Sequence, residues 1–78
     1  METEARILKV LQSLKGAAVN PGPDESLFES GILDSFALTD FVAGLEEEFA
    51  ISVPDSDLSA RKFETLNKVV AYVSAKAS

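Results

Sequence analysis

Three stretches of the sequence place apolar residues at the spacing of an α-helix, and this periodicity constrains the fold more than any other feature. The first predicted helix begins after Thr3, its expected N-cap, and ends at Gly16. The second runs from about Ser35 to Phe49, and the last begins after Thr65 and ends in the polar tail SAKAS. Their apolar stripes are Ile7, Leu8, Leu11 and Leu14 in the first, Leu38, Phe41, Val42, Leu45 and Phe49 in the second, and Leu66, Val69, Val70 and Val73 in the last.

The connections between these helices contain residues that interrupt regular structure. Residues 17–33 include NPGPDES, whose two prolines, glycine and asparagine favour turns. The apolar residues expected to anchor this connection to the core are Leu27, Phe28, Ile32 and Leu33. After the second helix, Pro54 favours extended backbone, and residues Asp55, Ser56 and Asp57 are expected to cap a short third helix. That helix should end near Lys62 and turn Leu58 inward.

The predicted fold class is therefore all-α. We expect a small four-helix bundle, with three main helices and one short helix, and with a long first loop. A chain of 78 residues is short enough to form one domain, so residues 1–78 are predicted to be a single domain with a thin core.

The composition excludes several classes of function. The chain contains neither cysteine nor histidine, so it has no disulfide, no thiolate metal site and no imidazole base. Seven basic and thirteen acidic residues give a net charge of -6, which disfavours binding to nucleic acid and to anionic membrane surfaces. METEARILKV does not resemble a signal peptide, and no apolar stretch approaches the roughly 20 residues that span a bilayer. We therefore expect a cytoplasmic, monomeric protein.

An exposed cluster is predicted around the start of the second helix. The column opposite its apolar stripe contains Phe36, Asp40, Ala43 and Glu47, with Asp34, Glu46 and Glu48 beside it. One apolar residue among acids suits a basic partner that has a hydrophobic socket. Ser35 begins this helix, where a serine often serves only as the N-cap and where free backbone N–H groups also favour a phosphate. Without histidine or cysteine, the chain has no base that would activate Ser35 for catalysis.

Residues 27–55, LFESGILDSFALTDFVAGLEEEFAISVPD, resemble the centre of an acyl carrier protein. Residues 31–35, GILDS, match the family's G-x-x-D-S motif, and LEEEF, ISVP and FETL resemble later parts of its pattern. The resemblance implies that a phosphopantetheinyl transferase, with Mg²⁺, transfers a 4′-phosphopantetheine arm from coenzyme A to Ser35. It also implies that Asp34 positions the metal or a basic residue of that enzyme. Phe36 and Ala37 differ from the residues that are commonest at these positions in fatty-acid carriers. This difference leaves open which partner enzymes the chain binds.

The function that the resemblance implies is that of a non-catalytic carrier. Such a carrier holds acyl intermediates as thioesters and delivers them to enzymes of fatty-acid, lipid or polyketide-type biosynthesis. The expected partners are the transferase, an acyl- or aminoacyl-activating ligase and acyl-processing enzymes with basic docking surfaces. They are predicted to contact Phe36, Asp40, Ala43, Glu46 and Glu47. Three alternatives stay open: an aminoacyl carrier of the D-alanyl or stand-alone peptidyl kind, an unmodified helical adaptor and, least favoured, a hydrolase.

Two further expectations concern the acidic surface and the core. Reversing the charge of Glu46 and Glu47 is expected to slow arm transfer and to leave the melting temperature almost unchanged. Phe41, Phe49 and Phe63 are expected to occupy part of the space between the second and last helices. A short or polar cargo is therefore predicted.

Overall fold

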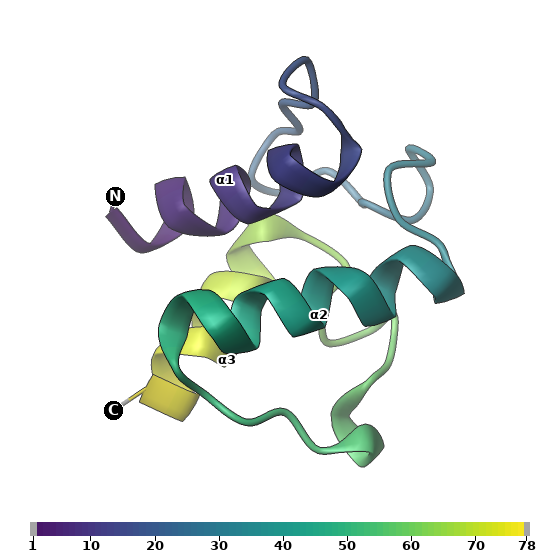
Figure 1. Ribbon diagram of the computed structural model, residues 1–78. Helices are drawn as coiled ribbons and strands as arrows, with labels where there is room; N and C mark the ends of the chain where they lie inside the picture. The colour runs from purple at the N-terminus through teal and green to yellow at the C-terminus, as the bar shows by residue number, and fades with distance from the viewer. Residues whose placement is uncertain (1, 78) are drawn as a thin grey trace.

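The computed structural model describes residues 2–77, which form three α-helices and one short 3₁₀ turn (Figure 1). These elements are α1 (Glu2–Lys15), α2 (Ser35–Phe49), η1 (Asp55–Asp57) and α3 (Leu66–Ala77). No strand occurs in this described part of the chain, so the predicted all-α fold class is confirmed. None of the described helices is long and apolar enough to cross a membrane.

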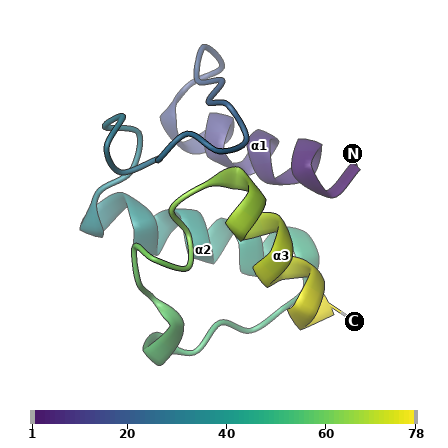
Figure 2. The same ribbon diagram turned by 180° about the vertical axis from the view of Figure 1, so that it is seen from behind.

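The three helices pack so that the start of α2 lies at one end of the molecule. In Figure 1, α1 and α2 face the viewer and run in opposite directions, while α3 lies behind them. Figure 2 shows the same arrangement from behind, with α3 in front. In both views the start of α2 points away from the end of the molecule that holds both chain termini. The residues around Ser35 are therefore left open to solvent on the side away from the termini.

One apolar core joins all three α-helices and both connections. Its buried members are Ile7 and Leu11 of α1, Leu38, Phe41, Val42 and Leu45 of α2, Leu66, Val69 and Val73 of α3, and Leu27, Leu33, Val53 and Phe63 of the connections. The predicted anchoring of the first connection is confirmed, with Phe28 and Ile32 partly buried against the same core. Phe41 and Phe63 are completely buried, and Phe49 is partly buried.

Two details of α1 differ from the prediction. The helix begins at Glu2, so Thr3 lies inside its first turn instead of capping it. A side-chain cap is not required there, because the first amides of a helix can be satisfied by water. Leu14, predicted to be in the core, is 38% exposed. Leu14 lies in the last turn of α1, which ends at Lys15, so its exposure depends on how this end of α1 lies on α2.

The second connection also differs from the prediction. The short third helix is only the single turn η1, which Asp55, Ser56 and Asp57 form instead of capping, and residues 60–63 form a further turn. Leu58, predicted to turn inward, is partly buried against the core. The predicted Thr65 cap of α3 is confirmed, since its hydroxyl accepts a hydrogen bond from the backbone N–H of Lys68 at 3.1 Å.

The carboxyl end of α3 is longer than predicted. The helix continues through the supposed tail as far as Ala77. Alanine and lysine are strong helix formers, so this segment has no residue that stops the helix.

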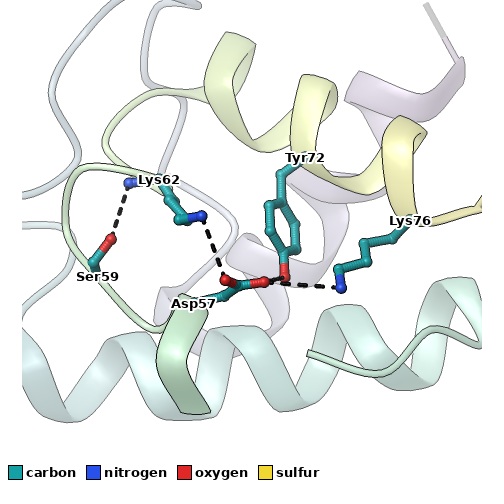
Figure 3. A network of polar contacts seen from close by, with 5 residues as sticks. All are labelled: Asp57, Ser59, Lys62, Tyr72 and Lys76. Carbon is teal, nitrogen blue, oxygen red and sulfur yellow. Dashed lines mark hydrogen bonds and ion pairs between the residues drawn. The ribbon is translucent and has the colours of Figure 1, made fainter. Parts of the chain in front are cut away.

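A polar network ties η1 to α3 (Figure 3). The Tyr72 hydroxyl donates a hydrogen bond to Asp57 Oδ2 at 2.6 Å. The Lys62 ammonium lies 3.3 Å from Asp57 Oδ1, and the Lys76 ammonium lies 3.8 Å from Oδ2. The Asp57 carboxylate therefore contacts one lysine of the second connection and two side chains of α3, Tyr72 and Lys76.

Candidate functional site

The first connection brings the chain to the start of α2 in a defined position. Leu27 and Leu33 are buried, and the backbone N–H of Leu33 donates to the carbonyl of Leu27 at 2.8 Å. The backbone N–H of Leu27 also donates to the carbonyl of Glu64, just before α3, at 2.7 Å. Gly31 lies between the two leucines with a φ of 83°, a conformation that favours glycine. These contacts position Ser35 without using its side chain.

The N-cap of α2 is Asp34, so the expectation that Ser35 caps this helix is corrected. Asp34 Oδ1 accepts hydrogen bonds from the backbone N–H groups of Phe36 at 3.0 Å and Ala37 at 2.8 Å. Asp34 has extended backbone, as an N-cap residue requires, whereas Ser35 is already helical. Aspartate and serine are about equally preferred as caps, so the sequence alone did not decide between them.

The Ser35 side chain is left exposed and free by this arrangement. Its hydroxyl makes no hydrogen bond to any other residue in the part of the chain that the structure describes. Attachment of a phosphopantetheine arm needs an accessible hydroxyl, so the residues present fit that group. The amides of Phe36 and Ala37 are already bonded to Asp34, so they are not free to bind the phosphate of an arm on Ser35.

Four of the five residues predicted to contact partners are exposed on α2. Phe36 is 86% exposed, and Asp40, Ala43 and Glu47 are exposed on the same helix. Within residues 2–77, neither the carboxylate of Asp40 nor that of Glu47 forms an ion pair or hydrogen bond. Their role in partner binding stays a prediction, and their exposure leaves them available for it.

Glu46 lies in a different environment from the other predicted contact residues. It is partly buried, and its Oε2 accepts a hydrogen bond from the backbone N–H of Val53 at 2.8 Å. Reversing the charge of Glu46 would remove this acceptor, so the expectation of an almost unchanged melting temperature is revised. A run of three glutamates gives no sign of which one turns toward the second connection.

No three histidine, cysteine or acidic side chains among the described residues are placed to hold a metal ion. Asp34 uses only Oδ1 for its cap, and Oδ2 has no partner among these residues. The same carboxylate can therefore cap α2 and still present one oxygen beside Ser35.

Comparison with known families shows the family to which the chain belongs. Residues 5–73 match the family model described as the phosphopantetheine attachment site. The chain belongs to this family. The family and the 4′-phosphopantetheine cofactor predicted from the sequence are thereby confirmed.

The curated relatives that match include several D-alanyl carrier proteins. The protein from Lactobacillus acidophilus is 36% identical over 73 residues, which cover 94% of this chain and 92% of the relative. The protein from Leuconostoc mesenteroides is 34% identical over 94% of both chains. The protein from Streptococcus suis is 33% identical over 94% of this chain and 92% of the relative. These relatives are carrier proteins, and their names favour the aminoacyl alternative over fatty-acid, lipid or polyketide-type biosynthesis.

Proposed function

We propose that this chain is a D-alanyl carrier protein with its phosphopantetheine arm on Ser35. The observation that supports this attachment residue is the free, exposed hydroxyl of Ser35 within GILDS at the start of α2. The D-alanyl cargo is inferred from relatives that share a third of their residues with nearly the whole chain. In this proposal the chain is non-catalytic and passes its cargo between other enzymes.

In arm transfer, Ser35 supplies the nucleophilic oxygen. A bond forms between this oxygen and the β-phosphorus of coenzyme A, and adenosine 3′,5′-bisphosphate leaves. The proton of Ser35 passes to a base of the transferase, because this chain has no histidine or cysteine to accept it. In this proposal the Oδ2 of Asp34, which the helix cap does not use, would contact the Mg²⁺ ion or a basic residue of the transferase. When attached, the arm supplies a thiol that holds the aminoacyl group as a thioester.

The packing of the core supports a small cargo. Phe41 and Phe63 are completely buried, so their side chains already fill space that a long acyl chain would need. A cavity in a dense core typically costs about 24 cal/mol per Å³, and an alanyl group held outside the core avoids that cost. The predicted short or polar cargo therefore agrees with D-alanine as the group carried.

Intact-mass measurement tests the attachment residue. Incubation with coenzyme A, Mg²⁺ and a broad-specificity transferase should add one arm to the wild type and to the control Ser13→Ala, and none to Ser35→Ala. Ser35→Ala should keep the wild-type melting temperature, because Asp34 caps the helix; Asp34→Ala should lose about 1 kcal/mol of stability. An arm on the Ser35→Ala variant would show that another residue is the attachment site.

The cargo is tested on the chain that already has its arm. With ATP and a D-alanine-activating ligase, the protein should gain one alanyl group, which hydroxylamine should release as expected for a thioester. A parallel reaction with an acyl-activating ligase and fatty acids of increasing length provides the comparison. Loading of long acyl chains with a rising melting temperature, and no loading of D-alanine, would contradict the proposed cargo.

A further inference from the structure

A hollow lies between α1 and α2, apart from Ser35. Its volume is about 380 Å³, and its lining includes the apolar residues Val10, Leu14 and Gly44 and the acids Asp40, Glu47 and Glu48. A Cβ on Gly44 would lie only 2.7 Å from Cγ1 of Val10, so this glycine allows the two helices to approach closely. Both helices face the viewer in Figure 1, with α3 behind them. All of its lining residues come from these two helices, and α3 contributes none.

Leu14 gives this hollow an exposed apolar side. Leu14 and Phe36 are the large hydrophobic residues that the described part of the chain leaves exposed. Leu14 is 38% exposed although it lies on a helix whose neighbouring apolar residues are buried. Covering exposed apolar surface with a partner side chain is favourable because it removes that surface from water. The exposed leucine beside a hollow indicates a place where an apolar side chain of a partner would fit.

The charges around the hollow specify the chemistry of that partner. Glu48 forms an ion pair with Arg6 of α1, in which Oε2 and Nε are 2.8 Å apart. Asp40 and Glu47 have no such partner among the described residues. Two uncompensated carboxylates next to an apolar hollow are complementary to an apolar side chain flanked by lysine or arginine.

The distance from Ser35 distinguishes between the expected partners. Gly44 lies nine positions after Ser35 in α2, about 13.5 Å along the helix axis at 1.5 Å per residue. The transferase must bring its catalytic groups to the Ser35 hydroxyl itself. A ligase acts on the thiol at the far end of the arm, so it can hold the carrier at a place remote from Ser35.

We infer that the D-alanine-activating ligase docks in the hollow between α1 and α2. It inserts an apolar side chain beside Leu14 and places basic residues opposite Asp40 and Glu47. This inference rests on the proposed function, because it names the partner that loads the arm.

The test measures ligase kinetics with three arm-loaded variants: Leu14→Ala, the double variant Asp40→Lys with Glu47→Lys, and a charge-matched control. The control is Glu29→Lys with Asp55→Lys, two exposed acids in the connections that do not line the hollow. Leu14→Ala should raise the KM for the carrier by about fivefold to tenfold, as truncation of an apolar interface anchor does. The Asp40/Glu47 variant should raise KM by about tenfold at low salt and less at high salt. In both variants kcat should stay near the wild-type value.

The outcomes separate this inference from the proposed function. Two results together would support the docking site. The two hollow variants should raise KM more than the control does, and Leu14→Ala should affect arm transfer less than it affects loading. If the wild type is loaded with D-alanine and all variants share its KM, the docking site is wrong and the carrier function stands. If the wild type accepts its arm and no D-alanine-activating ligase loads it, the proposed function is wrong and the ligase is not the occupant.

Discussion

The two long connections of this chain, residues 16–34 and 50–65, attach to the helices through different kinds of contact. The first buries Leu27 and Leu33, and its backbone bonds to the residues around the start of α3. The second also buries Val53 and Phe63. Two carboxylates hold it in place as well. Glu46 accepts a hydrogen bond from the Val53 backbone, and Asp57 contacts Tyr72, Lys62 and Lys76. The first connection also uses one carboxylate, because Asp24 Oδ1 accepts a hydrogen bond from Asn67 Nδ2 of α3 at 2.7 Å. The second connection differs in having two such carboxylates, and Asp57 also forms ion pairs with two lysines.

The two connections also differ in backbone geometry. The first has glycine at both of its left-handed positions, Gly16 with a φ of 115° and Gly31 with a φ of 83°. The second begins at Ala50, which has a φ of 54°. A residue with a Cβ pays roughly 1–2 kcal/mol for this conformation, so the surrounding contacts must offset that cost. The segment that leads to Ser35 is the less strained of the two.

The largest expected effect comes from the apolar anchor of the first connection. Leu27→Ala should destabilise the protein by about 2–5 kcal/mol, because Leu27 is completely buried and its loss leaves a cavity. Urea unfolding gives the free energy of unfolding, and Leu14→Ala, at an exposed position, should change it far less. Similar losses in the two variants would show that burial in the first connection does not hold it in place.

An intermediate effect is expected from the polar anchor of the second connection. Glu46→Ala leaves the Val53 N–H without its acceptor and should cost about 1–2 kcal/mol. Glu46→Gln keeps an oxygen at the same place and should recover most of the stability, while Glu47→Ala, the adjacent exposed acid, serves as the control. Hydrogen exchange shows where the effect lies. If exchange in Glu46→Ala is faster at Val53 and unchanged at Leu27, the effect is confined to the second connection.

The smallest effect is expected at the extremes of pH, through the Asp57 and Tyr72 pair. The hydrogen bond from Tyr72 is the main cause that lowers the pKa of Asp57 below 3.8, and Lys62 and Lys76 lower it further. Burial of the hydroxyl, and then its bond to Asp57, raise the pKa of Tyr72 from 10.0 to about 12. The contribution of Asp57 is therefore present above pH 3.8 and lost as the pH falls through its lower folded value. The contribution of Tyr72 is present below pH 10.0 and lost as the pH rises toward about 12.

This chain has one tyrosine and no tryptophan, so its ultraviolet absorbance reports the ionisation of Tyr72 directly. The titration midpoint should lie near 12 in the wild type. In Asp57→Asn it should fall but stay above 10.0, because burial of the hydroxyl remains. Asp55→Asn, in the same turn, should titrate like the wild type. A midpoint of 10.0 in the wild type would mean that the bond between Tyr72 and Asp57 does not form in solution.

Much of the fold and of the candidate attachment site could be predicted because local patterns determine them. Apolar residues three and four apart place α1, α2 and α3 on the core whatever the distant contacts are. GILDS lies within five consecutive residues, so a serine at a helix start and its acidic neighbour were both predictable. The choice of Asp34 as the cap was not, since either residue can cap and only the extended backbone of Asp34 decides it.

The sequence by itself determined the helical class, the apolar anchors of the first connection and the position of Ser35, because these depend on residues within about one helical turn. Only the tertiary structure decided which contacts each of the three adjacent glutamates of α2 makes. Glu46 bonds to Val53 seven residues away, Glu48 pairs with Arg6 from another helix, and Glu47 between them stays free. The same holds for Leu14, whose exposure depends on how α1 lies on α2. Residues that look alike in sequence acquire different environments because their partners come from distant parts of the chain, which only folding brings together.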